Sequence, residues 1–328
     1  MYLSTLRQLI LHDSFPCVTV SNPFACLFSL TEEEHNMHSI TVKSILSPTN
    51  GMNLYRGCSH GCIYCDSRSS CYQMDHDFED IAVKANALEL LEAALKSRQK
   101  RCMIGTGSMS DPYLPLEAEL GHTRAALQLI CKYGFGISLL TKSALVLRDL
   151  DVLSEINAQT KCVVQMTLTT YDESLCRILE PRVSTTRQRF EALLRLRDAG
   201  IPTVVWLCPL LPYLNDTEEN LTGILDYCRE AGVQGVVNFG MGLTLREGNR
   251  EYFYAQLDHY FPGLKERYIR EFGNRYEINS PKAETLWKLF HARCEEMGCL
   301  HNNDEIFRYL NAFEDKRAGV QLSLFGEV

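Results

Sequence analysis

The segment that decides the fold runs from Met52 to Cys65 and has the sequence MNLYRGCSHGCIYC. Its beginning, Met52–Arg56, is a short apolar run that predicts a β-strand. The rest of the segment places Cys58, Cys62 and Cys65 in one loop with the spacing C-x₃-C-x₂-C. A strand followed directly by a loop of thiols predicts a reactive centre at the carboxyl end of that strand.

Three thiolates from one loop suit a [4Fe–4S] cluster in which one iron keeps an open site for a small molecule, whereas four cysteines would only relay electrons. A structural zinc site usually needs a second C-x₂-C unit or a pair of histidines. The chain offers Cys294 and Cys299 five residues apart, and His291 and His301 ten residues apart. A zinc site and a chance grouping of core cysteines remain alternatives.

Outward from this segment, short apolar runs alternate with amphipathic stretches. Further strands are predicted at Cys102–Gly105, Gly136–Leu140, Cys162–Leu168, Thr203–Leu207 and Val233–Phe239. Helices are predicted at Asp80–Arg98, Leu120–Tyr133, Thr185–Ala199 and Thr217–Ala231. Six β/α repeats indicate an α/β fold with a parallel sheet, either a partial (β/α)₆ TIM-type barrel or a doubly wound sheet.

Capping residues mark the ends of two of these helices. Gly200 and Gly232 stand where the helix C-caps are expected. Asn215 or Asp216 is the expected N-cap of the helix that begins near Glu218.

The sequence divides into four parts. Residues 1–36 show no sustained period and are expected to form a poorly structured N-terminal extension, so Met37 is a candidate for the functional start. Residues 37–245 form the predicted barrel core. Residues 246–315 form a helical C-terminal subdomain whose many aromatic side chains predict a helical core, and residues 316–328 form a flexible tail.

Composition limits the compartment and the partners. The 328 residues are 45% hydrophobic and carry a net charge of −8, so the chain as a whole does not attract nucleic acid or anionic membranes over long range. No stretch approaches the ~20 apolar residues of a membrane span, and no secretory signal accompanies the fourteen cysteines. We therefore expect a cytoplasmic protein with reduced thiols and no membrane contact.

The cysteine loop resembles that of the radical S-adenosylmethionine (SAM) superfamily, which has an aromatic residue before the third cysteine, here Tyr64. Other segments resemble the spore photoproduct lyase-like (DNA repair photolyase-like) branch of that superfamily. These segments are Asn53–Cys58, Gly105–Tyr113, Leu140–Ser143 with Arg148-Asp149, and Leu179–Pro181. The resemblance covers residues 52 to about 240 and favours the partial barrel with a helical C-terminal extension.

The resemblance implies an enzyme with two cofactors, a [4Fe–4S] iron–sulfur cluster held by Cys58, Cys62 and Cys65, and SAM. In this superfamily the reduced cluster cleaves SAM to methionine and a 5′-deoxyadenosyl radical, so a flavodoxin- or ferredoxin-type electron donor is implied. The resemblance assigns the adenine to Tyr64, the amino end of SAM to the Thr106–Asp111 loop, the carboxylate to Lys142 and the ribose to Thr167. Within that loop it marks Thr106, Ser108 and Asp111.

One residue departs from the branch. In spore photoproduct lyases a cysteine three residues before the aspartate of this loop returns a hydrogen atom to the product radical. Ser108 holds that place here, three residues before Asp111. The resemblance therefore implies a relative with another substrate rather than an enzyme that reverses thymine dimers as such.

Two features suggest a nucleic-acid substrate and a DNA repair role. Six arginines lie between residues 177 and 197, at Arg177, Arg182, Arg187, Arg189, Arg195 and Arg197, and could meet phosphates. The segment Gln321-Leu322-Ser323-Leu324-Phe325 resembles the peptide by which bacterial repair proteins bind the sliding clamp. The alternatives are a radical SAM enzyme for a peptide or small metabolite, with the arginines structural, and an iron–sulfur protein without enzymatic activity.

Overall fold

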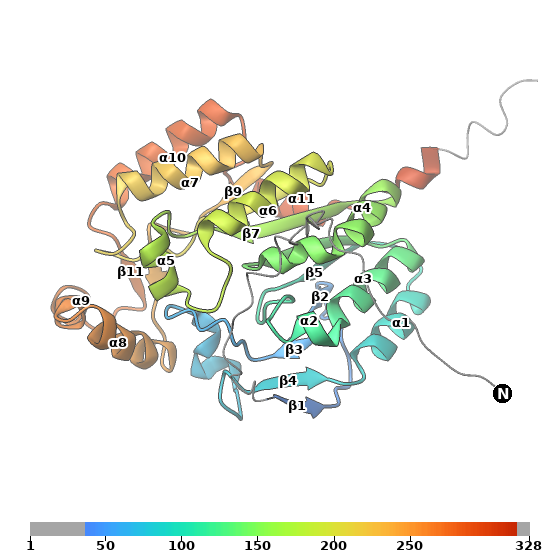
Figure 1. Cartoon of the computed structure of the whole chain (residues 1–328), viewed down its shortest axis with the longest axis horizontal. Helices are drawn as coiled ribbons and strands as arrows, with labels where there is room; N and C mark the ends of the chain where they lie inside the picture. The colour runs from blue at the N-terminus through green and yellow to red at the C-terminus, as the bar shows by residue number, and fades with distance from the viewer. Residues whose placement is uncertain (1–36, 320–328) are drawn as a thin grey trace, which may run out of the picture. The chain divides into compact units, whose positions relative to one another are not determined.

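A computed structural model describes residues 37–319, and its centre is a six-stranded parallel sheet. The strand order is β2-β5-β6-β7-β8-β9 (Figure 1). The strands are β2 (Gly51–Met52), β5 (Met103–Thr106), β6 (Gly136–Thr141), β7 (Cys162–Thr167), β8 (Thr203–Trp206) and β9 (Gly235–Val237). Since this order follows the chain without reversing, the sheet is a partial barrel and not a doubly wound sheet, which would reverse at a switch point.

Helices connect successive strands and cover one face of the sheet (Figure 1). They are α1 (Ala87–Ser97), α2 (Glu117–Leu120), α3 (His122–Tyr133), α4 (Leu150–Gln159), α5 (Glu173–Leu179), α6 (Thr186–Asp198) and α7 (Glu218–Ala231). Leu91, Ile156 and Leu225 from three of these helices share one hydrophobic core with Ile137 and Val164 of the strands. The predicted partial (β/α)₆ barrel is thus confirmed.

Side chains of the strands alternate between this core and the opposite, concave face. Val205 joins the core under the outer helices, whereas its neighbour Val204 packs on the other side against Ile306. Ile306 belongs to α11 (Asn303–Asn311), which closes part of the concave face. Sheet strands that are buried on both faces explain the continuous apolar runs in the sequence.

A second, small sheet was not predicted. It has the order β1-β4-β3 and consists of β1 (Met37–Ile40), β4 (Ile81–Lys84) and β3 (Tyr55–Arg56). The predicted strand Met52–Arg56 is therefore split between two sheets, and the first residues of the predicted helix Asp80–Arg98 form β4. Ile81 and Ala82 are fully buried between β1 and β3, and this pairing overrides the helical pattern.

The predicted glycine caps at the C-terminal ends of α6 and α7 are confirmed, and the predicted N-cap of α7 is wrong. Gly232 is the left-handed C-cap of α7, and Gly200 has φ 71° directly after the C-cap of α6. The N-cap of α7 is Thr217, whose hydroxyl accepts the Asn220 amide at 3.1 Å. Asp216 instead accepts hydrogen bonds from Tyr213 and Ser280, so it is not free to cap the helix.

The C-terminal part contains the four helices α8 (Asn249–Tyr260), α9 (Leu264–Phe272), α10 (Ala283–Met297) and α11. It also contains an unpredicted antiparallel pair of strands, β10 (Gly242–Thr244) and β11 (Glu277–Asn279). Phe253, Tyr268 and Phe272 form an aromatic core that also includes Cys62 and Tyr64 of the cysteine loop. The helical subdomain therefore packs against the predicted reactive centre.

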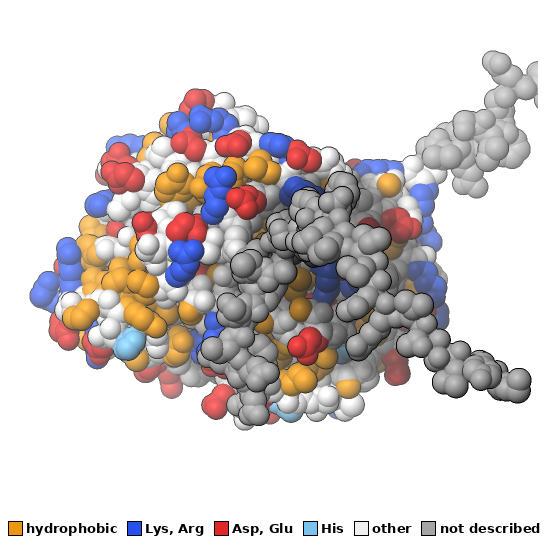
Figure 2. Space-filling view, viewed as in Figure 1, with side chains coloured by type: hydrophobic (Ala, Val, Ile, Leu, Met, Phe, Trp, Pro, Cys, Tyr) orange, Lys and Arg blue, Asp and Glu red, His pale blue; other side chains and the backbone are white. Residues whose placement is uncertain are grey.

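The surface mixes charges of both signs, and Figure 2 shows Lys and Arg interspersed with Asp and Glu over the visible face. Within residues 37–319, no helix is both long and apolar enough to cross a membrane. The predicted N-terminal extension and the Gln321–Phe325 segment lie outside the described residues. The four-part division of the chain stays a prediction.

Candidate functional site

The cysteine loop follows β3 and is fixed by backbone hydrogen bonds to two distant segments. The amide of Cys58 donates to the carbonyl of Phe78 at 2.9 Å, and the amide of Ile63 donates to Leu179 at 3.0 Å. Gly57 has φ 87°, and a Cβ atom there would lie 2.7 Å from the Phe78 carbonyl oxygen. The loop therefore needs glycine at this position, and its backbone path is fixed by these contacts.

The three thiols lie close enough together to affect one another's ionisation. Burial raises the pKa of Cys58 to about 12, and the neighbouring Cys65 and Asp111 add to the shift. Burial also raises the pKa of Cys62 well above its usual value, although Lys142 acts in the opposite direction. Iron must therefore displace protons from this loop as it binds. Cys62 is buried, and Cys58 and Cys65 are half-buried. Three such thiols in one loop, with no side chain at Gly57 or Gly61, fit a cluster held by three cysteines.

Asp111 connects the cysteine loop to the ends of two strands. Its Oδ1 accepts hydrogen bonds from Thr141 Oγ1 at 2.7 Å and from the Tyr113 amide at 2.8 Å. Its Oδ2 accepts the Lys142 amide at 2.7 Å and lies 3.2 Å from His60 Nε2. Burial acts to raise the pKa of Asp111, but His60 and these donors outweigh it and lower the value to about 2. Asp111 thus stands in the site as a fully hydrogen-bonded carboxylate.

The rest of the loop after β5 packs beside the cysteine loop. Ser110 Oγ donates to the carbonyl of Gly57 at 2.7 Å. Gly107 has φ 96°, and a Cβ atom there would lie only 1.9 Å from the Leu140 carbonyl oxygen. Thr106 is buried at the end of β5, whereas Ser108 is exposed. The Thr106–Asp111 loop is therefore a close neighbour of the predicted cluster.

Lys142 follows β6 and is the site's half-buried cation. Burial acts to lower its pKa, but Cys62, Glu180 and other nearby anions raise it overall. Among residues 37–319 its ammonium group has no hydrogen bond or ion pair. A charged donor next to the cysteine loop is thus available to a carboxylate, as the resemblance implies.

A buried chain of polar groups holds Tyr64 and Thr167. The Tyr64 hydroxyl donates to Glu180, and Glu180 pairs with Arg189, with both side chains 0% exposed. Arg189 Nη1 also donates to the Thr167 carbonyl at 2.7 Å. The end of β7 and the aromatic side chain of the cysteine loop are therefore connected through one ion pair.

This ion pair corrects the predicted basic patch, because Arg189 is buried and cannot meet a phosphate. Of the other arginines, Arg187 pairs with Glu191 at 3.0 Å and Arg177 approaches Glu173 at 4.0 Å. The remaining three members, Arg182, Arg195 and Arg197, are exposed. The patch is therefore smaller and more neutralised than the sequence suggested.

The sequence missed His60, Arg189 and Cys208 as site residues. His60 lies between the first two cysteines in the sequence, so its position could have marked it as a site residue. In α6 the buried residues Thr186, Arg189 and Leu193 follow the helical period, which marks Arg189 as inward-facing. Cys208 lies just beyond β8 and close enough to Lys142 for that cation to act on its pKa, which burial raises to about 11.

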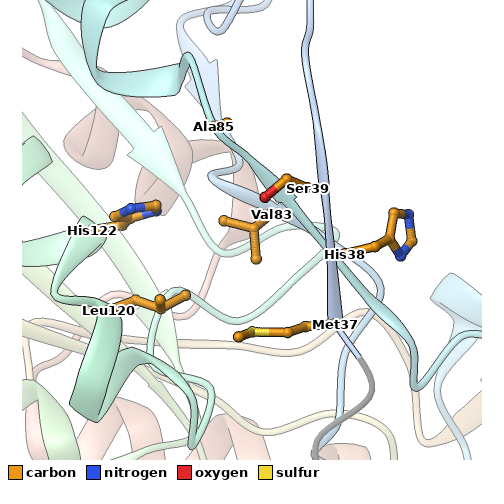
Figure 3. Close-up of a pocket in the computed structure, with 7 residues that line it drawn as sticks. All are labelled: Met37, His38, Ser39, Val83, Ala85, Leu120 and His122. Atoms are coloured by element: carbon orange, nitrogen blue, oxygen red, sulfur yellow. The ribbon is translucent and has the colours of Figure 1, made fainter.

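A cavity of about 340 Å³ lies elsewhere, beside β1 and β4. Its lining includes Met37, Val83 and His122, whose side chains face one another, while the ring of His38 points away from them (Figure 3). None of the predicted site residues lines it, so the strand ends, and not this cavity, form the candidate site.

Known proteins resemble this chain over the region that contains the cysteine loop. The family model of the radical SAM superfamily matches residues 52–223. An uncharacterized protein of Mycobacterium tuberculosis (strain H37Rv) is 32% identical over 223 residues, which are 66% of this chain and 65% of the relative. An uncharacterized protein of Methanocaldococcus jannaschii is 32% identical over 51% of this chain and 62% of its own length. The chain thus spans less than two thirds of these relatives.

Solved structures share the fold. Spore photoproduct lyase complexed with dinucleoside spore photoproduct superposes with a TM-score of 0.57 at 14% identity, over 81% of both chains. The radical SAM methyltransferase TsrM from Kitasatospora setae, with cobalamin and a [4Fe–4S] cluster bound, has a TM-score of 0.50 at 16% identity and covers 73% of this chain and 52% of its own. At these identities the likeness concerns the fold.

The matched region contains the cysteine loop, the loop after β5, Lys142 and Thr167, which the fold brings to one edge of the sheet. It covers more than half of the chain, and [4Fe–4S] and SAM are the cofactors that accompany it. With this loop at the carboxyl edge of a six-stranded partial barrel, the chain belongs to the radical SAM superfamily of enzymes.

Proposed function

We propose that this protein cleaves SAM reductively and uses the resulting 5′-deoxyadenosyl radical on a nucleic-acid lesion or modified base. The observation that carries the first half is the Lys142 ammonium, which has no hydrogen bond or ion pair within residues 37–319, beside the three thiols of the cysteine loop. A cluster held by Cys58, Cys62 and Cys65 would supply the electron for the cleavage.

The chain's own residues bind and orient SAM. Lys142 receives the carboxylate, and Asp111 fixes the backbone of Lys142 through its amide. Tyr64, held by Glu180, borders the adenine, and the end of β7 at Thr167 faces the ribose. Thr106 and Ser108 belong to the loop that meets the amino end. Because these groups are positioned before SAM arrives, little reorganisation is needed at the moment of cleavage.

The nucleic-acid substrate is supported by the shared fold of spore photoproduct lyase, a protein whose structure holds a dinucleoside spore photoproduct. The exposed Arg182 and Arg187 lie on the segment that follows Glu180 and could meet a phosphate backbone. A base inside a duplex would have to be extruded to reach the radical. A peptide or small metabolite is the alternative substrate, and the methyltransferase TsrM shows that the same fold carries another reaction.

Partners follow from the same proposal. A flavodoxin- or ferredoxin-type protein would deliver the electron, and the Gln321–Phe325 segment would bind a sliding clamp through its two leucines and its phenylalanine. The chain would work in the cytoplasm as a lyase-like repair enzyme, where its many thiols stay reduced.

Anaerobic reconstitution with iron, sulfide and a reductant tests the first half. The protein should produce 5′-deoxyadenosine from SAM, and a Cys58→Ala/Cys62→Ala/Cys65→Ala variant should lose both iron and this activity. Cys131→Ala, which removes another buried thiol distant in sequence, is the matched control. Iron loading without SAM cleavage would leave only an electron-relay protein.

Oligonucleotide binding tests the second half. Affinity for DNA should fall with rising salt and with Arg182→Ala/Arg187→Ala, and deuterium should pass from a labelled lesion-containing oligonucleotide into 5′-deoxyadenosine. Binding that ignores salt and both arginines, together with deuterium transfer from a peptide instead, would favour the alternative substrate.

A further inference from the structure

An aromatic cluster with one exposed member lies at the same edge of the sheet as the SAM site. It consists of Trp206 at the end of β8, Phe239 two residues beyond β9, and Phe307 of α11. Ring centroids are 5.6 Å apart for Trp206 and Phe239, 6.0 Å for Phe239 and Phe307, and 6.1 Å for Trp206 and Phe307. We call these three rings the aromatic platform.

Phe239 is the unusual member, because its side chain is 61% exposed, the largest value among the exposed large hydrophobic residues between 37 and 319. An aromatic ring left in water forgoes the stabilisation that burial would give. Its backbone is nevertheless well fixed. The Asn238 carbonyl accepts Asn303 Nδ2 at 2.9 Å, and the Gly240 amide donates to Asn238 Oδ1 at 2.8 Å. The ring is thus presented to solvent by a rigid turn.

Trp206 is equally well oriented. Its Nε1–H donates to Gln165 Oε1 at 2.8 Å, and Gln165 Nε2 donates to Ser138 Oγ at 2.9 Å. Three neighbouring strands therefore fix the indole ring on the concave face. A ring surface whose supports are already in place can bind a flat partner with little loss of side-chain entropy.

The platform is continuous with the SAM site. Trp206 is the register partner of Thr167, the residue expected to face the ribose, at the end of the neighbouring strand β7. Phe239 lies beside Trp206, with ring centroids 5.6 Å apart. A substrate group that rests on Phe239 would therefore stand next to the place where the radical forms.

We propose that the aromatic platform stacks a nucleobase of the substrate, with Phe239 as the contacting ring. This inference rests on the nucleic-acid half of the proposed function and names the residues that recognise the base. A nucleobase suits the platform because every base has a flat π face, so stacking on an aromatic ring needs no further hydrogen bond.

Three substitutions of Phe239 in the reconstituted holoenzyme separate stacking from simple apolar contact. Phe239→Tyr keeps the ring, Phe239→Leu keeps apolar bulk without a ring, and Phe239→Ala removes both. The probes are a fluorescein-labelled single-stranded oligonucleotide and the same strand with abasic sites. Tyr260→Leu is the control, because Tyr260 is an exposed aromatic residue of α8 in the helical part.

We expect Phe239→Ala and Phe239→Leu to bind the intact strand about 5- to 140-fold more weakly, the range for loss of one base–aromatic stack. Phe239→Tyr and Tyr260→Leu should bind it as the native protein does, and the abasic strand should bind all variants equally weakly. Equal affinity of Phe239→Leu and the native protein, or of the intact and abasic strands, would overturn the proposal.

The SAM dissociation constant, measured on the same variants, excludes another assignment. A loss of SAM affinity that matches the loss of oligonucleotide affinity would mean that Phe239 contacts the adenine of SAM, which would also overturn the proposal. If the native protein binds no oligonucleotide in a salt-dependent way, the proposed function itself fails. If it binds and only the arginine variants weaken binding, the proposed function stands and the role of Phe239 does not.

Discussion

Replacement of Arg189 by methionine should destabilise the protein strongly, because it leaves Glu180 buried without its partner. In the native protein both side chains are 0% exposed, and Arg189 also donates to the Thr167 carbonyl at 2.7 Å and to Cys176 Sγ at 3.2 Å. Methionine fills much of the same volume but supplies none of these donors.

The expected loss is about 3 to 5 kcal/mol, the usual cost when one member of a buried ion pair is removed. Glu180 keeps only the neutral Tyr64 hydroxyl, Thr169 and Cys176 as neighbouring donors. The orphaned carboxylate will take up a proton more readily, because Arg189 contributes most, ahead of Lys142 and Tyr64, to lowering its pKa against the effect of burial. The free energy of unfolding should therefore fall by less than it would if Glu180 stayed charged. We expect a loss of about 3 kcal/mol, the lower end of the range for a broken buried ion pair.

Urea unfolding at neutral pH under anaerobic, reducing conditions measures this loss. Arg187→Met is the matched control on the same helix, since Arg187 and Glu191 form an exposed i,i+4 pair that should contribute less than about 1 kcal/mol. The double variant Arg189→Met/Glu180→Leu should recover part of the loss, because no unpaired charge remains. A loss for Arg189→Met no larger than for Arg187→Met would refute the reasoning.

Three further predictions concern the site. In urea unfolding, Gly107→Ala should destabilise the fold by several kcal/mol more than Gly121→Ala. Both glycines have positive φ, but only a Cβ atom at Gly107 would meet a backbone oxygen, at 1.9 Å. Equal losses of stability in the two variants would contradict the close contact. Lys142→Met should raise the SAM dissociation constant about 10- to 140-fold, which corresponds to the loss of a hydrogen bond to a charged group. Lys142→Arg should have a dissociation constant between those of Lys142→Met and the native protein. A dissociation constant that calorimetry finds unchanged in Lys142→Met would remove Lys142 from the SAM site. The pKa of Asp111 is lowered to about 2, below its unfolded value of about 3.9. The resulting stabilisation is present above pH 4 and is lost as the pH falls toward 2. The free energy of unfolding should therefore decrease less steeply between pH 4 and pH 2 in Asp111→Asn than in the native protein. An identical pH dependence in the two proteins would contradict the lowered pKa.

The sequence predicted the barrel well because its strands are self-evident. β5 to β9 are continuous apolar runs between helices with clear caps, and the alternation of element types decides the architecture. The sequence could not assign Ile81–Lys84, because a short strand whose stability comes from pairing with β1 and β3 has no periodicity that separates it from the start of the following helix.

The cysteine loop was equally easy to recognise, since its three thiols lie within one short segment, and their role as cluster ligands stays a prediction. The supporting residues were not, because they come together only in the fold. His60 and Asp111 are 51 positions apart in the sequence, and Glu180 meets Tyr64 across 116 positions. Arg189 was counted with the surface arginines because a charged residue is usually exposed, although its place on the buried stripe of α6 pointed inward.

The backbone anchoring of the cysteine loop has a consequence for how the enzyme is made. Two of its anchors, the Leu179 carbonyl and the Arg182 amide, belong to a part of the chain that the ribosome adds late, 122 positions after His60 in the second case. At translation rates of about 5–20 residues per second this delay is roughly 6–24 s. During that interval the thiols are present on a nascent chain that has the Phe78 anchor but lacks these two, so we expect cluster insertion to follow the synthesis of Arg182.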